Sequence, residues 1–412
     1  MEAEAEVVIV GAGHAGLSCA LGLREEGWTG AVTLVGDEPH PPYDRPPLSK
    51  RVLVDPESAA TISLATPESL ARSGIRYLEG RVTGIDRGGS AILLADGTRH
   101  PYAHLVLATG AAARRLPTAM SGAGASGVQV IRTLDDALAV AHLLDDSERV
   151  VVLGGGFIGV EAAAAIARSG RAVTLLEKLD VLLPRVAPRV LGEWAEQHLT
   201  SLGVDVRTAT TATAVETDER GRVTGVLDSA SERHPARLVV LGLGATPAVG
   251  LADAAGLTVE GAVVVDERLA TDDPAISAIG DCAVQILADG SRHRYESVQA
   301  AQDQGRYLAR RLVRPTDSPY EEVPWFWSDI GPATVQLAGR MDLARETVLR
   351  GTPGSGNFSL FGYDGAAFVG VAAVNRPRDY VAGRTFLRKG AHLPATVAVD
   401  EGVDLRALAR RA

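Results

Sequence analysis

The same order of apolar and polar positions occurs in two stretches of the chain. Each stretch begins with a run of β-branched residues, passes through a glycine-rich turn, and continues through a helix of small residues into a second apolar strand. The first stretch starts at Val7, with a helix to about Glu26, and the second starts at Val150, 143 positions further along, with a helix to about Arg168. This repetition predicts an internal duplication of one α/β unit.

Both turns carry glycines in the spacing GxGxxG. These are Gly11, Gly13 and Gly16 in the first turn and Gly154, Gly156 and Gly159 in the second. In this context the first glycine allows a tight turn, the second lets a pyrophosphate approach the backbone, and the third lets the helix pack on the strand. The start of the following helix offers free N–H groups and the positive end of its dipole to the phosphates.

An acidic residue follows each turn at the distance from which it can bond ribose hydroxyls. Asp37 or Glu38 fills this place in the first copy, and Glu177 fills it in the second. Two bound dinucleotides are therefore predicted. A protein that holds two of them most simply passes a hydride from one to the other.

Further strands indicate how the duplicated unit is inserted in the chain. Apolar runs that start at Leu105 and Leu238 lie where the chain would leave one domain and return to it. From about Val323 onward, alternating strands with Gly, Pro and Asn turns predict a separate α+β domain. We therefore expect an α/β protein with a first dinucleotide domain at 1–110 and 241–324, a second at 111–240, and a C-terminal domain at 325–412.

Composition excludes several other classes of protein. Of 412 residues, 41 are basic and 51 acidic, and a net charge of −10 argues against nucleic-acid binding. Only Cys19 and Cys282 are present, which excludes a disulfide framework, a cysteine-rich metal site and a CxxC redox pair. The nine histidines are scattered and no HExxH or GxSxG string occurs, so no metal is expected. The acidic N-terminus and the glycines within the apolar stretch 150–167 predict a cytoplasmic protein without a membrane span.

Several rare strings occur in a fixed order along the chain. They are Gly11-Ala-Gly-His-Ala-Gly16, Pro42-Tyr-Asp-Arg-Pro-Pro-Leu-Ser-Lys50, Ala108-Thr-Gly110, Gly154-Gly-Gly-Phe-Ile-Gly-Val-Glu161, Gly280-Asp281, Glu296-Ser-Val298 and Pro324-Trp-Phe-Trp-Ser-Asp329. With them the chain resembles, over nearly its whole length, the FAD-dependent NAD(P)H reductases of ferredoxin and rubredoxin type, within the glutathione-reductase-like fold. The resemblance is to the putidaredoxin-reductase-like members and to the reductase components of aromatic-ring dioxygenases.

The resemblance implies which residues hold FAD. Gly11, Gly13, Ala15 and Gly16 would line its pyrophosphate, Asp37 would bond its ribose, Val82 would present its backbone to the adenine, Asp281 would bond the ribityl chain, and Val298 would contact the isoalloxazine ring. Arg45, Lys50 and Arg132 would bring cations to the cofactor, with Lys50 near the flavin. The matching strings add Ala108, Thr109, Gly110, Gly280, Glu296 and Ser297 to the cofactor-binding set.

The resemblance also implies an NADH site and catalytic residues. Gly154, Gly156, Phe157, Ile158, Gly159, Glu161 and Glu177 would bind NADH, with Glu161 near the nicotinamide. Lys50, Glu161 and Trp327 are the expected catalytic residues, and Trp327 would lie beside the flavin.

The residues themselves leave other interpretations of these side chains open. Lys50 could be a solvated loop charge, Arg45 could pair with Asp44, and Trp327 could belong to the core of the C-terminal domain. Glu161 lies on an otherwise apolar helix, so a partner such as Lys50 is expected to offset the cost of burying its charge.

The lack of cysteine in the stretch 39–51 indicates the class of electron acceptor. Members of this fold that reduce disulfides need a redox cysteine there, so we expect the flavin to pass electrons directly to an external acceptor. The expected acceptor is an acidic 2Fe-2S ferredoxin that supplies a cytochrome P-450 or a ring-hydroxylating dioxygenase. Alternatives are a rubredoxin reductase, an NADH oxidase or other flavoprotein with a small acceptor, and a non-catalytic dinucleotide-binding redox sensor. Glu177 favours NADH over NADPH, although Lys178 beside it carries the opposite charge.

A row of arginines predicts a docking surface for an acidic partner. In the helix expected over 300–313, only Asp303 opposes this row, which consists of Arg306, Arg310, Arg311 and Arg314. The alternative is an ordinary solvated helix face. Two departures from the family pattern, Ile330-Gly331-Pro332 after Asp329 and Thr246 in place of an arginine, affect the flavin edge and one cation but neither fingerprint.

Overall fold

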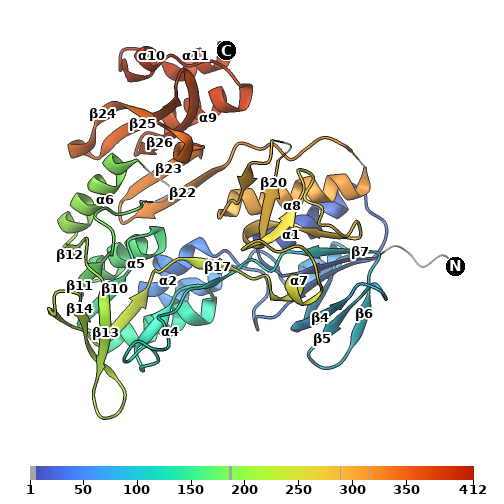
Figure 1. Ribbon diagram of the computed structural model, residues 1–412, viewed down its shortest axis with the longest axis horizontal. Coiled ribbons are helices and arrows are strands. Elements are labelled where there is room, and N and C mark those ends of the chain that lie inside the picture. The colour runs from blue at the N-terminus through green and yellow to red at the C-terminus, as the bar shows by residue number, and fades with distance from the viewer. Residues whose placement is uncertain (1–5, 185–187, 288, 315) are drawn as a thin grey trace. The chain divides into compact units, whose positions relative to one another are not determined.

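The computed structural model describes residues 6–184, 188–287, 289–314 and 316–412 (Figure 1). The chain forms two compact units, each built from three segments. The first comprises Met1–Asp44, Ile62–Ala112 and Thr246–Glu322, and the second comprises Arg45–Thr61, Ala113–Ala245 and Val323–Ala412. Two of the crossings between the units run through the short strands β8 (Ala111–Ala113) and β17 (Ala245–Pro247).

A five-stranded parallel sheet forms the centre of the first unit. In spatial order its strands are β19 (Ile276–Ala278), β7 (His104–Leu107), β1 (Val7–Val10), β2 (Val32–Gly36) and β3 (Arg76–Glu79). All four residues of β1 are buried, as expected for a central parallel strand covered on both faces. The β-branched and leucine side chains of these strands form the main hydrophobic core of the unit.

The longest helices of the first unit are α1 (His14–Glu25) and α8 (Val298–Val313), which pack side by side (Figure 1). Their close approach depends on Gly305, where a Cβ would lie 2.6 Å from the carbonyl oxygen of Ala15. An antiparallel sheet of β4 (Val82–Asp86), β5 (Ala91–Leu94) and β6 (Arg99–Pro101) adjoins the helix α7 (Gly250–Ala254). The remaining elements are α3 (Pro67–Arg72), β18 (Val263–Val265), β20 (Ala283–Ile286) and β21 (Arg292–His293).

The second unit contains a parallel sheet in which four of the five strands repeat this order, while the remaining edge strand comes first among the five along the chain instead of last. The sheet runs β9 (Val128–Val130), β16 (Leu238–Leu241), β10 (Arg149–Leu153), β11 (Ala172–Leu176) and β12 (Val204–Arg207), and an antiparallel sheet of β13 (Ala212–Thr217), β14 (Val223–Asp228) and β15 (Arg233–Pro235) again accompanies it. Its helices are α2 (Arg51–Val54), α4 (Leu134–Asp145), α5 (Phe157–Arg168) and α6 (Arg189–Ser201). The shared order confirms the duplication predicted from the sequence.

The end of the chain forms an antiparallel sheet covered by helices. Its strands are β22 (Trp325–Ile330), β23 (Ala333–Gly339), β26 (Ala367–Val374), β25 (Asn357–Asp364) and β24 (Glu346–Thr352). The helices α9 (Pro377–Lys389) and α10 (Ala395–Val399) pack against the sheet, and α11 (Leu405–Arg411) packs against α9, around a core that includes Phe361 and Phe386 (Figure 1). Strand β22 also lies along α5, within the same unit.

Candidate functional site

The first fingerprint turn connects β1 to α1 and has the geometry that a dinucleotide requires. Gly11 has a φ of +112°, and a Cβ there would lie 2.1 Å from the carbonyl oxygen of Ala108. A Cβ on Gly16 would lie 1.9 Å from the carbonyl oxygen of Gly11, so helix and turn touch directly. A Cβ on Gly13 would meet no atom within 4 Å. The middle glycine therefore borders open space of the kind that a pyrophosphate fills.

The second turn, between β10 and α5, repeats this geometry. Gly154 has a φ of +106°, and a Cβ on Gly159 would lie 1.9 Å from the carbonyl oxygen of Gly154. At Gly156 the nearest atom to a Cβ is the carbonyl oxygen of Gly242, 3.9 Å away. Both turns thus keep the open side of the middle glycine clear, and both fit a dinucleotide.

Each fingerprint helix begins without a side-chain cap. Gly13 and Gly156 are the N-cap residues of α1 and α5, and neither helix has an acidic residue in its first turn. The N–H groups at these helix starts are therefore available to an anion, and the helix dipole favours one.

The acidic residues of the two copies differ in their surroundings. Glu177 is 7% exposed, and its carboxylate accepts hydrogen bonds from the backbone N–H groups of Gly155 at 2.6 Å and Leu179 at 2.9 Å. It therefore holds the fingerprint turn in place. Asp37 is open to solvent, with its carboxylate 3.6 Å from the guanidinium of Arg81, and Glu38 accepts a hydrogen bond from the hydroxyl of Tyr43.

Several predicted FAD residues of the first unit have structural partners. The hydroxyl of Thr109 donates to the carbonyl oxygen of Ala248 at 2.7 Å, and that of Ser297 accepts the backbone N–H of Ala300 as the N-cap of α8. Glu296 forms an ion pair with Arg294.

One residue that sequence reasoning missed supports the Gly280-Asp281 turn. The buried side-chain oxygen of Gln304 accepts the backbone N–H of Gly280 at 2.7 Å, and Gly280 has a φ of +75°. Gln304 lies on α8, more than 20 residues away in sequence. Its role depends on helix packing, and no local motif reveals it.

The expected pair of Lys50 and Glu161 is present in the second unit. The ammonium of Lys50 lies 3.0 Å from Oε1 of Glu161, and the Glu161 side chain is 5% exposed. Two hydroxyls, from Ser49 and Ser328, also donate to this carboxylate. The expectation that a buried Glu161 needs a cationic partner is confirmed, and the solvated-loop alternative for Lys50 is wrong.

Other residues of the Pro-rich loop and of β22 are placed as follows. The guanidinium of Arg45 donates to the backbone carbonyl oxygen of Arg132 at 2.7 Å, which links two of the predicted cofactor-binding residues. Asp44 pairs with His14, at 2.9 Å. Trp325 and Trp327 are both half-buried on β22, and Trp325 packs against the C-terminal core with the guanidinium of Arg384 over its ring.

The Ile330-Gly331-Pro332 departure forms a two-residue hairpin turn. Ile330 pairs with Ala333, and Gly331 has a φ of +58°, as a tight turn between two strands requires at its first central position. The carbonyl oxygen of Ile330 accepts a hydrogen bond from His198 at 2.9 Å. The family difference is therefore accommodated by contacts with α6.

Both cysteines are buried thiols. Burial raises the pKa of Cys19 to about 12, and burial is also the main cause that raises the pKa of Cys282. A thiolate is the reactive form, so both residues are poor nucleophiles. The interpretation of Cys19 as a packed core thiol is confirmed.

The expectation that Asp303 alone opposes the arginine row is wrong. Glu26, at the end of α1, lies 3.3 Å from Arg310 and 3.4 Å from Arg314, while Asp303 pairs with Arg306 at 2.6 Å. Arg311 instead donates to the carbonyl oxygen of Arg268. A positive surface remains at Arg306, Arg310 and Arg314, but two acidic groups partly neutralise it.

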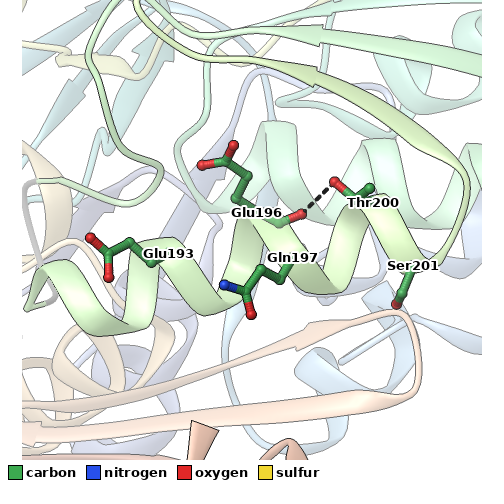
Figure 2. Close-up of a pocket in the computed structure, with 5 residues that line it drawn as sticks. All are labelled: Glu193, Glu196, Gln197, Thr200 and Ser201. Carbon is green, nitrogen blue, oxygen red and sulfur yellow. Dashed lines mark hydrogen bonds between the residues drawn. The ribbon is translucent and has the colours of Figure 1, made fainter. Parts of the chain in front are cut away.

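A hollow lies along α6, and the residues that line it are not among those predicted to bind a cofactor. It is lined by Glu193, Glu196, Gln197, Thr200 and Ser201, all from one helix (Figure 2). The hydroxyl of Thr200 donates to the backbone carbonyl of Glu196 in the turn before it, at 2.9 Å (Figure 2). Within the described parts of the chain, no helix is long and apolar enough to cross a membrane.

The fold and the two glycine turns define a class: α/β proteins with two dinucleotide sites, one in each duplicated unit. Comparisons with known proteins agree. Residues 5–305 match the family described as pyridine nucleotide-disulphide oxidoreductase, and residues 325–409 match the family described as reductase C-terminal.

The chain is also similar to individual proteins over almost its full length. Rhodocoxin reductase of Rhodococcus erythropolis is 39% identical, covering 98% of this chain and 94% of the relative. The crystal structure of the ferredoxin reductase for the CYP199A2 system from Rhodopseudomonas palustris matches with a TM-score of 0.95 at 37% identity, over 98% of this chain and 99% of that one. The covalent putidaredoxin reductase–putidaredoxin complex matches with a TM-score of 0.94 at 36% identity, over 100% of both chains.

The chain therefore belongs to the pyridine nucleotide-disulphide oxidoreductase family and carries the C-terminal domain of its reductases. It is an oxidoreductase, and the predicted α/β fold is confirmed. Enzymes of this family use FAD and NAD(P)H, which agrees with the two cofactors predicted from the duplicated fingerprint.

Proposed function

We propose that this protein is an NADH-dependent ferredoxin reductase. It takes a hydride from NADH onto FAD and passes electrons one at a time to a 2Fe-2S ferredoxin, which supplies a cytochrome P-450 or a ring-hydroxylating dioxygenase. FAD supplies the chemistry that links the two, because a flavin accepts two electrons together and releases them singly. The observation that carries the proposal is the pair of equivalent glycine turns, each with open space at its middle glycine.

The assignment of the two cofactors is the one that the family resemblance implies, and the residues around each turn are compatible with it. FAD binds at the first turn, where Asp37 is accessible to a ribose, and NADH binds at the second. At the second turn Glu177 accepts two backbone N–H bonds and keeps lone pairs for the ribose hydroxyls. Its negative charge repels a 2′-phosphate, so NADH is the preferred coenzyme.

In this proposal Lys50 and Glu161 act on the negative charge that the hydride brings to the flavin. The ammonium of Lys50 stabilises negative charge on the flavin, and its attraction is strong because the pair is largely shielded from water. Glu161 holds the ammonium in place. Trp327 is half-buried on β22. In this proposal it is the aromatic residue beside the flavin, as the family resemblance implies.

The nature of the acceptor follows from the thiols and from the relatives. Cys19 and Cys282 are both buried with raised pKa values, so neither relays electrons as a thiolate. FAD, held by the first unit, would therefore supply its electrons to an external acceptor. The similar structures include a ferredoxin reductase and a reductase joined to putidaredoxin, and these support an iron–sulfur protein in that role.

The exposed arginines Arg306, Arg310 and Arg314 provide the docking surface in this proposal. Their side chains are between 51% and 71% exposed, and they would steer an acidic ferredoxin despite the net negative charge of the chain. Glu26 weakens this surface, so we expect a moderate contribution to docking.

The test is NADH-dependent reduction of cytochrome c in the presence of a panel of 2Fe-2S ferredoxins, with ferricyanide as a small-acceptor control. We expect ferricyanide reduction without any ferredoxin, and rapid cytochrome c reduction only when a cognate ferredoxin is added. Fast oxygen consumption that no ferredoxin redirects would instead identify an NADH oxidase. Binding of both cofactors without any NADH oxidation would identify a redox sensor.

A further inference from the structure

The carboxylate of Glu161 is held from two sides by hydroxyl groups. Its Oε2 accepts from the hydroxyl of Ser49, and its Oε1 accepts from the hydroxyl of Ser328 at 2.6 Å. The ammonium of Lys50 lies 3.0 Å from the same Oε1. Ser49 and Ser328 are each 1% exposed, so no bulk water competes for these bonds.

The three partners come from separate segments of the second unit. Ser49 ends the 3₁₀ turn just before Lys50, Glu161 lies in the second turn of α5, and Ser328 lies on β22. Strand β22 is fixed along α5 by its neighbours on the same face, because the ring of Phe326 packs edge-on against Phe157 with centroids 4.7 Å apart. The Ser328 hydroxyl therefore reaches the carboxylate from a well-packed strand.

Hydrogen bonds to both oxygens of the Glu161 carboxylate affect the direction in which the Lys50 ammonium points. The terminal torsion of a glutamate is broad, so a carboxylate with one partner can rotate and carry that partner with it. Here both oxygens are occupied. The ammonium of Lys50 also donates to the carbonyl oxygen of Pro46 at 3.1 Å. An ammonium has three protons, and these two contacts use two of them.

We propose that Ser49 and Ser328 are positioning residues, whose hydroxyls lock the Glu161 carboxylate and thereby fix the direction of the Lys50 ammonium. The inference rests on the proposed function, in which Lys50 acts on the charge of bound FAD. Neither serine touches the reacting atoms. Their effect passes through the orientation of one carboxylate and one ammonium.

The first test compares the FAD-loaded wild type with S49A, S328A and the double variant. The midpoint potential of the flavin, measured by dye equilibration without NADH, should become more negative in each variant, because a displaced ammonium stabilises the reduced anionic flavin less. The limiting rate of flavin reduction by NADH should fall about tenfold while the Kd for NADH changes little, as expected for an interaction that acts on the transition state. S328T, which restores a hydroxyl, should recover most of both losses.

Two controls separate positioning from a structural contribution. S147A removes another buried hydroxyl of the same unit, one that donates to the carbonyl oxygen of Leu143, and should leave the flavin potential unchanged. In the E161Q background the serine substitutions should add little further effect, because they act through the Glu161 carboxylate.

Unchanged potential and limiting rate in S49A/S328A would overturn the proposal, and so would fully additive effects in the E161Q background. The outcome is distinct from that of the proposed function. If NADH bleaches the wild-type flavin but the serine variants behave identically, only the positioning role fails. If NADH does not bleach the wild-type flavin, the proposed function fails, while the dye-measured potentials still decide whether the serines act on Lys50.

Discussion

The middle glycine of the second fingerprint offers a sharp test of the two-site arrangement. In G156A the new methyl group would lie 3.9 Å from its nearest neighbour, and Gly156 has a φ of −76°, which alanine adopts without strain. The fold should therefore tolerate the change within about 1 kcal/mol. The methyl group, however, fills the space that a pyrophosphate needs in order to reach the backbone.

The expected loss of NADH affinity follows from the contact removed. A hydrogen bond to a charged group is worth about 1.5–3 kcal/mol, so losing one backbone contact to the pyrophosphate raises the Kd for NADH roughly 10- to 150-fold. Bound FAD should remain, because the first turn is unchanged. The assay is anaerobic stopped-flow, in which the dependence of flavin bleaching on NADH concentration gives the Kd.

Two matched variants complete this test. G159A places a Cβ 1.9 Å from the carbonyl oxygen of Gly154, so it should lower the unfolding midpoint through overpacking of about 1–3 kcal/mol or more. G13A, the counterpart of G156A in the first turn, should lose FAD instead of NADH. Wild-type NADH binding in G156A, or loss of FAD with NADH binding retained, would refute the role of Gly156 in binding NADH.

Three other predictions concern charge. The kcat/KM for NADH should exceed that for NADPH, and E177Q should lower the ratio of the two values several-fold because its side chain no longer repels a 2′-phosphate. A wild-type preference for NADPH would contradict the role of Glu177. R310E should raise the KM for an acidic ferredoxin in cytochrome c reduction and leave ferricyanide reduction intact, whereas equal losses in both assays would exclude the docking surface. Burial, together with the nearby Arg311 charge, lowers the pKa of His104 to about 4, so the native state keeps this histidine neutral where the unfolded chain protonates it. This residue should therefore lower the free energy of unfolding by about 3 kcal/mol as the pH drops from 6.5 to 4. Urea unfolding of H104Q should lack that part of the loss, and the same pH dependence in H104Q and the wild type would contradict the lowered pKa of His104.

Much of this site could be predicted from the sequence because it depends on local geometry. The three glycines of each turn lie within six residues, and the structure shows a positive φ at the first, open space beside the second and close packing at the third. The Lys50–Glu161 pair was predictable for a different reason, since a carboxylate on an apolar helix needs a cation nearby.

The missed residues depend on contacts between distant segments. Ser328 meets Glu161 from 167 positions away, and Glu26 meets Arg310 from 284 positions away. Nothing in the local pattern around a serine or a helix-end glutamate reveals such a partner. The arginine row was therefore overestimated as a positive surface, because its opposing charge comes from another helix.

The most direct test of the account is an anaerobic titration of the FAD-loaded protein with NADH, followed by addition of an oxidised 2Fe-2S ferredoxin. We expect one equivalent of NADH per FAD to bleach the flavin absorbance near 450 nm, and two equivalents of the ferredoxin to restore it by taking one electron each. A flavin that NADH does not bleach, or a bleached flavin that only oxygen reoxidises, would contradict it.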